Sequence, residues 1–581
     1  MREITLYINK KKVTVPEGTT IMEAAAQADI EIPALCWLKD INEDGACLIC
    51  QVEAIGKKDL IISCKTKVEE GMEVTTNSPR VIAARKNTLR LLLSGHEKKC
   101  LSCVRSGGCE LQKLCEKYGI EDDTYYEEGK RQKYELDISA PHMVRDNNKC
   151  ILCRRCVAVC KDVQGIGVIG TNSRGYDSYI GSAFDLGLGQ TSCVSCGQCI
   201  AACPTGALYE KDATEAVFRA LADPTKVVIA QTAPAVRAAL GECFGLPAGT
   251  DTEDKMVAAL RELGFDKVFD TDLGADLTIM EEANEFLERM KSGKNLPLIT
   301  SCSPGWVTFC EYYFPEMLDN LSTCKSPHEM LGAMIKTYYG QKNNISPEDI
   351  VVVSIMPCTA KKVEIGREGM DASGVQDVDY VLTTRELSRM IKKRDINFLR
   401  LENAEFDDPL GISTGAGMIF GASGGVMEAA LRTAVESLQG EELSAVEFHQ
   451  VRGMEGIKEA EFDVSGQKIR VAAVSGLANA RKILEAVADG SAAYHFIEIM
   501  GCPGGCINGG GQPQVPAAVR NFTDYRKLRA QVLYQLDEDR SLRKSHDNPM
   551  IQKLYQDFIG EPGGPTAHKL LHTKYRKREL Y

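Results

Sequence analysis

The chain has 581 residues, a formal net charge of −12 and a sequence pI near 5.4. This length predicts about four domains, and the acidic balance argues against nucleic acid as a partner. The start of the chain, MREITLYINKKK, does not resemble a signal peptide, and there is no run of 18 apolar residues. We therefore expect a cytoplasmic protein without membrane insertion.

The 23 cysteines are the most informative feature of the composition. In a reducing compartment they should serve as metal ligands or catalytic thiols rather than as disulfides. Their spacing indicates which of these roles applies to each group.

Residues 1–78 begin with the alternating runs ITLYI and VTV, which predict a hairpin, and continue with the helical pattern TTIMEAAAQADI. Four cysteines follow: Cys36, Cys47, Cys50 and Cys64. A hairpin, a helix and four such thiols indicate a β-grasp ferredoxin domain with one 2Fe–2S cluster. Tetrahedral zinc is the alternative, because four thiolates also suit Zn²⁺.

Residues 79–139 start with the helical run RVIAARKNTLRLLLSGHE. One imidazole and three thiols follow closely: His96, Cys100, Cys103 and Cys109. This set alone also fits a zinc site. Its position between two iron–sulfur modules favours a 4Fe–4S cluster with one histidine ligand.

Residues 140–210 contain two runs with the spacing Cys-x2-Cys-x2-Cys-x3-Cys, in which the fourth thiol of each run binds the other cluster. This rule pairs Cys150, Cys153, Cys156 and Cys203 on one 4Fe–4S cluster. It pairs Cys193, Cys196, Cys199 and Cys160 on the other. The three modules would hold four accessory clusters, one 2Fe–2S and three 4Fe–4S, which together move single electrons.

From residue 211 to 581 the chain has an α/β pattern. Apolar runs such as KVVIAQ, LPLIT, IVVVSIM, IRVAAVS and YHFIEIM alternate with helical stretches. Such runs predict parallel strands buried on both faces, and ligands of open α/β sheets bind beyond the carboxyl ends of the strands.

Three of these predicted strands end in cysteine-containing loops. The loops are ITSCSPGW with Cys302, SIMPCTAKK with Cys358, and EIMGCPGGC with Cys502 and Cys506. Glycines crowd the third loop, which suggests close approach to a bulky inorganic ligand. Four unrelated core cysteines and a plain glycine-rich turn are the alternatives.

The loops TSCSPGW, MPCTAKKVE and EIMGCPGGCINGGGQP, together with the tail KSHDNP…AHKLLHTKY, resemble the signature motifs of FeFe-hydrogenases. The resemblance covers essentially the whole chain and implies an α+β multidomain protein with an α/β catalytic domain. It also implies an H-cluster, which is a 4Fe–4S cubane joined to a diiron unit with CO, CN and azadithiolate ligands. Family positions that would hold it are the cubane ligands Cys358, Cys502 and Cys506, the ammonium of Lys361, and the packing side chains Met356 and Met500.

The first loop departs from the family, which usually has two adjacent cysteines, one relaying protons and the next binding the cubane. Here Cys302 is followed by Ser303. Since serine is a poor ligand for a soft cluster, we favour Cys302 as the fourth cubane ligand and Ser303 in the proton path. Strict register gives the opposite assignment, which stays open.

The family's proton route implies Glu282, Ser322, Glu285 and Arg289. Three of these residues share one face of a predicted helix, and a solvated charged face would explain that spacing equally well.

The resemblance thus implies reversible conversion of H2 to protons and electrons, after diiron maturation factors have acted. The cluster set is similar to that of catalytic subunits in multisubunit, NAD(P)-linked and electron-bifurcating hydrogenases. Flavin and NAD would then lie on iron–sulfur partner subunits, with ferredoxin as another partner, because the chain has no convincing nucleotide motif. The alternatives are a stand-alone ferredoxin-dependent hydrogenase, a hydrogen sensor, and a non-catalytic wiring subunit.

Overall fold

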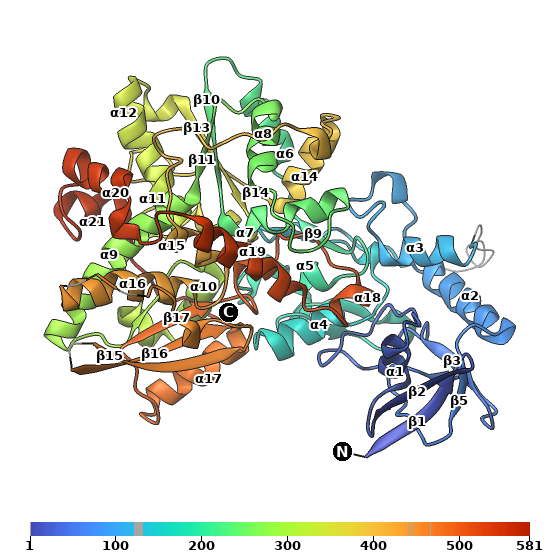
Figure 1. The fold of residues 1–581 in the computed structure, drawn as a ribbon. Coiled ribbons are helices and arrows are strands. Elements are labelled where there is room, and N and C mark those ends of the chain that lie inside the picture. Colours follow the sequence, from blue (N-terminus) through green and yellow to red (C-terminus); the bar gives the residue numbers. More distant parts are fainter. Residues whose placement is uncertain (1, 121–131, 441, 444, 465, 581) are drawn as a thin grey trace.

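The computed structural model describes residues 2–120, 132–440, 442–443, 445–464 and 466–580. Figure 1 shows the amino-terminal sheet at one end of the molecule, with the long α/β part at the other end. No helix within the described ranges is long and apolar enough to cross a membrane.

The amino-terminal sheet has the strand order β2-β1-β5-β3-β4. Strands β1 (Glu3–Ile8) and β2 (Lys11–Pro16) form the predicted antiparallel hairpin, and β5 (Glu73–Thr75) pairs with β1 in parallel. Helix α1 (Ile21–Gln27) begins with a capping box at Thr20, and its apolar face packs into the core of the sheet. The sheet is completed by β3 (Gln51–Ala54) and β4 (Ile61–Ile62).

Two small iron–sulfur modules follow. The first contains α2 (Pro79–Ser94) and α3 (Glu110–Lys117). In the second, two short helices lie within the cysteine-rich runs, and two pairs of short antiparallel strands flank them. The helices are α4 (Arg155–Ala158) and α5 (Gln198–Ala202), and the strand pairs are β6 (Met143–Arg145) with β9 (Leu208–Glu210) and β7 (Gly170–Asn172) with β8 (Tyr179–Gly181).

The five apolar runs predicted as strands are all strands, and they are divided between two sheets. One sheet is parallel throughout, with the order β11-β10-β13-β14, and the other has the order β12-β17-β16-β15, where only the β15–β16 pair is antiparallel. The first sheet contains β10 (Val227–Thr232), β11 (Lys267–Asp270), β13 (Ile350–Met356) and β14 (Tyr380–Thr383). The second contains β12 (Leu298–Ile299), β15 (Ile457–Val464), β16 (Gln467–Ser475) and β17 (Phe496–Met500).

Helices surround both sheets (Figure 1). They are α8 (Glu253–Leu263), α9 (Thr271–Ser292), α10 (Pro304–Tyr313), α11 (Pro327–Met334), α14 (Thr384–Lys393), α16 (Gly425–Gln439), α17 (Leu477–Ala488), α19 (Tyr525–Asp539), α20 (Pro549–Leu554) and α21 (Pro565–Leu571).

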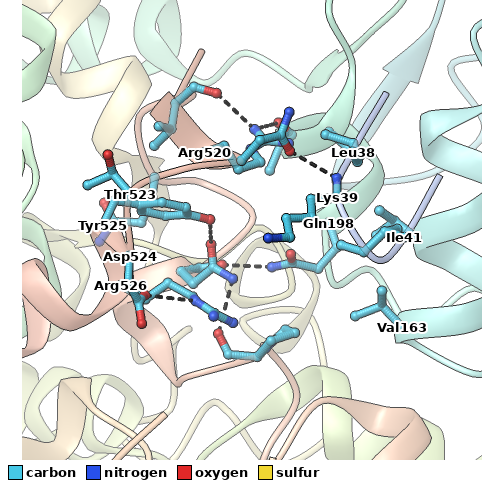
Figure 2. A pocket seen from close by; sticks show the side chains of 18 of the residues that line it. Leu38, Lys39, Ile41, Val163, Gln198, Arg520, Thr523, Asp524, Tyr525 and Arg526 are labelled. Atoms are coloured by element: carbon cyan, nitrogen blue, oxygen red, sulfur yellow. Dashed lines mark hydrogen bonds and ion pairs between the residues drawn. The ribbon is translucent and has the colours of Figure 1, made fainter. Parts of the chain in front are cut away.

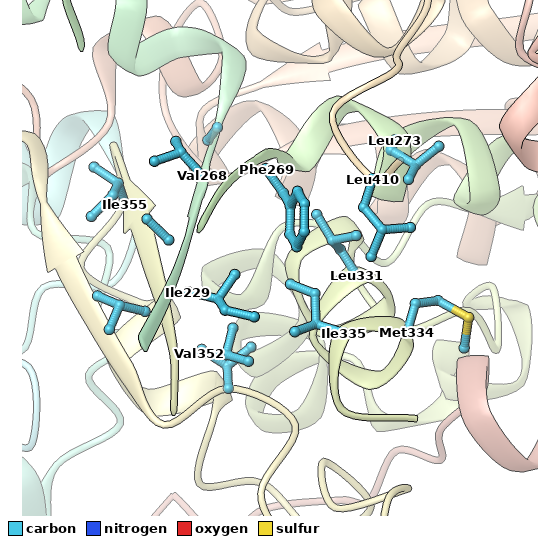
Figure 3. Close-up of a cluster of buried hydrophobic side chains, with 14 of the residues drawn as sticks. Ile229, Val268, Phe269, Leu273, Leu331, Met334, Ile335, Val352, Ile355 and Leu410 are labelled. Carbon is cyan, nitrogen blue, oxygen red and sulfur yellow. The ribbon is translucent and has the colours of Figure 1, made fainter. Parts of the chain in front are cut away.

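Helix α9 connects the two cores of this α/β part. Leu273 belongs to the apolar core of the first sheet. Figure 3 shows this core, which also contains the strand residues Ile229 and Val352 and the helix residue Leu331. Further along α9, Phe286 belongs to the core of the second sheet. Because the helix packs against both cores, Glu281, Glu282 and Arg289 face the protein interior, whereas Glu288 and Lys291 are exposed.

Candidate active site

An internal cavity of about 70 Å³ lies where the cysteine loops meet. The loop after β12 comes from the second sheet, the loop after β13 from the first, and the loop after β17 again from the second. The residues that line the cavity are mostly apolar or sulfur-containing: Ala233, Pro234, Thr271, Ala275, Cys302, Pro327, His328, Met356, Pro357, Cys358, Lys361, Phe420, Gly421, Met500 and Cys506. The predicted residues Met356, Met500 and Lys361 are thus all walls of one cavity.

Hydrogen bonds hold the three loops together. Gly501 N–H donates to Ser303 Oγ at 3.1 Å, which joins the first loop to the third. Gly511 N–H donates to the carbonyl of Pro357 at 2.7 Å, which joins the second loop to the third. These contacts fix the positions of thiols that lie up to 200 residues apart in the chain.

The thiols at this junction fit a soft metal cluster. Burial, together with the nearby thiolate of Cys358, raises the pKa of the Cys506 thiol to about 12. Burial likewise raises the pKa values of Cys358 and Cys502. A thiolate in such a place requires a cation as partner, and thiolate sulfur is the usual ligand of iron–sulfur clusters.

The structure separates the two residues of the first loop whose roles were left open. Cys302 lines the cavity, and Glu282 is the charged group that most raises the pKa of its thiol after burial. Ser303 is not among the lining residues, and its hydroxyl faces Gly501, the neighbour of Cys502. This arrangement favours the strict-register assignment over the one preferred from the sequence.

Lys361 is held from behind by a buried polar network. Its Nζ donates to Glu364 Oε2 at 2.7 Å and to the Cys302 carbonyl at 3.2 Å. The same Glu364 oxygen lies 2.8 Å from His328 Nε2, while His328 Nδ1 lies 3.1 Å from Ser354 Oγ. The ammonium therefore has a fixed position at the cavity wall.

The charge states of this network follow from burial. Burial lowers the pKa of His328 to about 4, so the imidazole is neutral at physiological pH. The Lys361 ammonium and the His328 hydrogen bond lower the pKa of Glu364 to about 2 against the effect of burial. Sequence analysis missed both Glu364 and His328; the acid three residues after Lys361 was the available signal, and His328 had none.

The predicted proton route is brought together in space. Glu282 is buried, and burial raises its pKa to about 8. The Ser322 hydroxyl donates to Glu285 Oε2 at 3.2 Å and also lies within hydrogen-bonding reach of Glu282. Glu285 Oε1 accepts from Arg289 at 2.6 Å. The exposed fractions of Glu282, 1%, and Arg289, 9%, exclude a solvated charged face.

The third loop needs glycine for a reason other than the close approach to an inorganic ligand that the sequence suggested. A Cβ on Gly510 would lie 2.3 Å from the Cys196 carbonyl oxygen, and one on Gly509 would lie 2.2 Å from the Pro357 carbonyl oxygen. The bare backbone is thus required by close packing against other loops. This packing places the Cys193–Cys199 run directly against the loop that contains Cys502.

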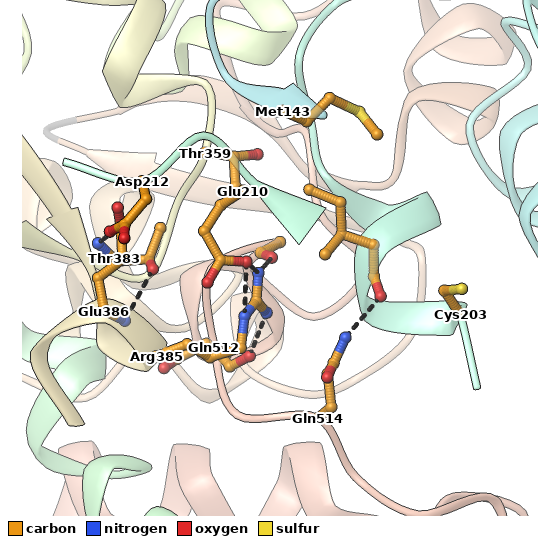
Figure 4. A network of polar contacts seen from close by, with 12 residues as sticks. Met143, Cys203, Glu210, Asp212, Thr359, Thr383, Arg385, Glu386, Gln512 and Gln514 are labelled. Carbon is orange, nitrogen blue, oxygen red and sulfur yellow. Dashed lines mark hydrogen bonds and ion pairs between the residues drawn. The ribbon is translucent and has the colours of Figure 1, made fainter. Parts of the chain in front are cut away.

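A buried ion-pair network fastens the same loop (Figure 4). Arg385 donates to Glu210 Oε2 at 2.8 Å and to the carbonyls of Gly510 at 2.8 Å and Gln512 at 2.6 Å. Gln514 donates to the Ile200 carbonyl of α5 at 2.7 Å. Arg385 and a second arginine hold the pKa of Glu210 well below its usual range despite burial. The interface between this cysteine-rich module and the α/β part is therefore fastened by buried polar contacts.

The thiols of the two Cys-x2-Cys runs are arranged as their spacing predicts. Cys150, Cys153, Cys156 and Cys203 line one small cavity. Burial raises the pKa of Cys199, and Cys193 and Cys160 raise it further because they lie nearby. The first set of four and three members of the second set thus lie close together, and the pairing of each set on one cluster stays a prediction.

The two amino-terminal modules both approach the Cys150–Cys203 group. Asn42 donates to the carbonyls of Cys36 at 2.7 Å and Cys153 at 3.1 Å, which links the β-grasp thiols to this group. Arg105 donates to the Cys203 carbonyl at 3.1 Å, which links the His96 module to it. The path is therefore forked, with two branches that meet at one predicted cluster.

The predicted ligands are close together in the β-grasp branch and differ in exposure in the other. In the β-grasp module the Cys50 and Cys64 sulfurs lie 3.3 Å apart, and Cys36 and Cys47 interact directly. In the next module His96 is 7% exposed and Cys109 is 9% exposed, while Cys100 is exposed. The exposed Cys100 places this module at the protein surface.

A larger cavity, of about 450 Å³, lies between the modules and the segment before α19 (Figure 2). Lys39 N–H donates to Asn521 Oδ1 at 3.0 Å, and Tyr525 Oη donates to Asn508 Oδ1 at 2.8 Å. None of its lining residues is a cysteine. Despite its size, this cavity offers no thiol ligands for a cluster. The residues that line it form contacts between the modules.

Family models match most of this arrangement. Residues 226–510 match the carboxyl-terminal domain of the iron-only hydrogenase large subunit, and residues 523–578 match the iron hydrogenase small subunit. Residues 1–79 match a 2Fe–2S cluster binding domain, 85–124 an NADH-ubiquinone oxidoreductase-G iron–sulfur binding region, and 149–207 a 4Fe–4S dicluster domain.

Two curated relatives match over essentially the whole chain, and a third matches two thirds of it. The NADP-reducing hydrogenase subunit HndD of Solidesulfovibrio fructosivorans is 50% identical over 100% of both chains. Iron hydrogenase 1 of Clostridium pasteurianum is 44% identical over 99% of this chain and 100% of its own. Cytosolic iron-sulfur assembly component 3 of Rattus norvegicus is 30% identical over 67% of this chain and 83% of its own.

The fold is also similar to that of a solved FeFe-hydrogenase structure. A variant of apo [FeFe]-hydrogenase HydA1 from Chlamydomonas reinhardtii is 41% identical, with a TM-score of 0.57, and covers 63% of this chain and 99% of its own. The expected fold class, iron–sulfur domains followed by an FeFe-hydrogenase catalytic domain, is confirmed.

Proposed function

Because the chain belongs to the FeFe-hydrogenase family and is an FeFe-hydrogenase, we propose that the cavity beside Cys302, Lys361 and Cys506 holds its H-cluster. The observation that carries the proposal is the meeting of three cysteine loops from two sheets around one buried, sulfur-lined cavity. When bound, the H-cluster supplies the redox chemistry that splits or forms H2.

Cys358, Cys502 and Cys506 would hold the cubane, and Ser303 stands at the fourth position. Lys361 presents a fixed positive charge to the cavity, where anionic ligands of the cluster can accept from it. The apolar side chains of Met356 and Met500 exclude water and adapt their shape to the bound group.

On the other side of the cavity, Cys302 would take a proton and exchange it with Glu282. A carboxyl group with a pKa of about 8 can both accept and donate a proton near neutral pH. Ser322 then bridges to Glu285, which lies closer to the surface. In this scheme Cys302 relays protons and is not a cubane ligand.

Electrons would leave through the forked path of accessory clusters. The Cys193–Cys160 cluster comes first, the Cys150–Cys203 cluster second, and the 2Fe–2S and His96 clusters form the two outer ends. Two outer ends allow two electron partners. The full-length relative named as an NADP-reducing hydrogenase subunit supports partner subunits and NADP⁺ as an electron acceptor. We further propose that these partner subunits carry flavin and NAD(P) sites in the cytoplasm, with ferredoxin as the second acceptor in a bifurcating complex.

The test is H2-dependent reduction of viologen by the matured chain, followed by NADP⁺ reduction by the complex purified at native expression. We expect viologen reduction by the chain alone and NADP⁺ reduction only with its partners. Viologen reduction by a chain that has no co-purifying partners would favour a stand-alone, ferredoxin-dependent enzyme.

A role in iron–sulfur assembly is the second candidate, because one relative over two thirds of the chain is named as an assembly component. A sensor or a purely wiring subunit would share the clusters as well. Negligible turnover of H2 with a fully loaded cluster would favour these over the enzyme.

A further inference from the structure

The described proton route reaches Glu285 and then meets a residue that cannot carry a proton onward. Arg289 donates to Glu285 at 2.6 Å and to the carbonyls of Asn295 at 2.9 Å, Asn320 at 3.0 Å and Leu321 at 2.8 Å. A guanidinium does not lose its proton at physiological pH. Arg289 therefore anchors Glu285, and another group has to exchange protons between Glu285 and solvent.

A second chain of polar contacts begins at the same carboxylate. Thr323 donates to Glu285 Oε2 from its backbone N–H at 3.0 Å, and its hydroxyl lies 3.3 Å from the same oxygen. The Thr323 hydroxyl also lies 2.7 Å from His572 Nδ1. The other ring nitrogen, His572 Nε2, lies 3.0 Å from Glu281 Oε2. One hydroxyl thus connects Glu285 to a histidine from the far end of the chain.

The backbone holds this histidine firmly in place. The segment that contains it pairs with residues 323–325: Thr573 N–H donates to the Thr323 carbonyl at 2.8 Å, and Lys325 N–H donates to the Leu571 carbonyl at 2.7 Å. The His572 side chain is 7% exposed. On the solvent side, the exposed His568 has its ring centroid 4.4 Å from that of His572.

We propose that Thr323, His572 and His568 form the outlet of the proton route, which rests on the proposed hydrogenase function. With its proton on Nε2, neutral His572 donates to Glu281 and accepts the Thr323 hydroxyl proton at Nδ1. When a proton arrives at Glu285, Thr323 accepts it and passes its own proton to Nδ1. The Thr323 hydroxyl is restored, and the imidazolium is balanced by Glu281.

The proton then leaves the imidazolium for solvent. The short distance between the two rings leaves room for transfer to His568 by ring rotation or through one water molecule. H2 formation would use the same steps in reverse. Histidine suits this position because each of its ring nitrogens can either donate or accept a proton.

The charged and titratable groups around His572 come from each neighbouring element. They are Glu281 and Glu285 of α9, Cys324 of the paired segment, His568 of α21, and Tyr555, whose hydroxyl donates to Glu281. The alternative is a purely structural role, in which His572 only anchors the carboxyl-terminal segment to α9.

Matched variants separate the two roles. His572→Gln keeps a polar side chain but cannot pass a proton, and Thr323→Val removes the bridge. Tyr575→Phe is the control, because the Tyr575 hydroxyl fastens the same segment through the backbone carbonyls of Ser322 at 2.7 Å and Cys324 at 3.3 Å, and not through the side chains of Thr323, His572 or His568. We expect H572Q and T323V to lower H2 turnover about tenfold in dilute buffer, below the usual effect of direct acid–base groups, and Y575F to change it less than about twofold.

Two further measurements distinguish proton transfer from anchoring. The activity of His572→Ala should rise when imidazole is added, and the solvent isotope effect of H572Q should exceed that of the wild type. Independently of turnover, the infrared band of the protonated Glu282 carboxyl should exchange with D2O more slowly in H572Q than in Y575F.

The outlet is overturned if the active wild type and H572Q show equal turnover, equal isotope effects and equal exchange of the Glu282 band. It is also overturned if Y575F shows the same losses as H572Q. A loaded wild type that does not turn over H2 would instead contradict the proposed function, and the D2O exchange would still test the outlet.

Discussion

The two sides of the active-site cavity use charged residues in opposite ways. On one side, the Lys361 ammonium, the Glu364 carboxylate and neutral His328 form hydrogen bonds that satisfy one another. On the other side, Glu282 Oε2 has no hydrogen-bond partner among the described residues, and burial raises its pKa to about 8. An ion-paired group keeps its charge, whereas a carboxyl that has no ion-pair partner among the described residues and has a pKa near neutrality can gain and lose a proton. In the proposed function, the first side would position the H-cluster and the second would move protons.

The largest expected effect comes from a substitution of Glu282, on the second side of the cavity. Glu282→Gln keeps size and polarity but cannot relay a proton, so we expect H2 turnover to fall about a thousandfold. The measurement is viologen-coupled H2 oxidation, with the infrared spectrum of the cluster as the control for intact loading. Retention of activity within about tenfold would show that protons use another path.

A substitution of Lys361, on the first side of the cavity, should lower the stability of the protein as well as its activity. Lys361→Met leaves Glu364 buried without its cation, and we expect a loss of about 3 kcal/mol in the free energy of unfolding. The double variant Lys361→Met with Glu364→Gln should regain most of this loss without regaining H2 turnover. Denaturant unfolding under anaerobic conditions measures the stability. No recovery in the double variant would contradict the pairing.

Cys302 lies between the two sides and sharpens the comparison. As a relay, Cys302→Ser should lower turnover about a hundredfold while the iron content and the spectrum of the cubane stay unchanged. Ser303→Cys should instead alter the electron paramagnetic resonance spectrum of the cubane. If C302S lost cluster iron, Cys302 would be a ligand, as preferred from the sequence.

The smallest effect concerns stability against pH. The pKa of Glu282 is raised above its usual 4.5 in the folded state, so ionisation of the unfolded chain between about pH 4.5 and 8 disfavours folding. E282Q removes this penalty and should be more stable than the wild type at pH 8, by about 1–2 kcal/mol once the site relaxes, with no gain at pH 4. Thermal unfolding at the two pH values tests the sign. A gain at pH 4 equal to that at pH 8 would contradict the raised pKa.

The sequence predicts the accessory modules best, because their ligands are local. Cys150, Cys153 and Cys156 are separated by two residues each, so their spacing alone indicates a cluster. The strands that end in cysteine loops are also visible as apolar runs. Their division between two sheets, which brings β12 and β13 to one cavity, depends on long-range packing that periodicity does not contain.

The residues that the sequence does not reveal are joined by distant contacts. His328 reaches Glu364 across 36 positions, and His572 reaches Thr323 across 249. The third loop was expected to need glycine for a metal cluster, yet Gly510 is required by the Cys196 backbone. The assignment of Cys302 and Ser303 depends on where each side chain points, which adjacent positions in a sequence leave undetermined.

The most direct test of the central claim is the infrared spectrum of the anaerobically matured chain. An H-cluster in the cavity predicts bands of metal-bound CO and CN in the wild type, and their loss in Cys506→Ala with the accessory clusters intact. A fully matured wild type without these bands, or a C506A variant that keeps them, would contradict the account.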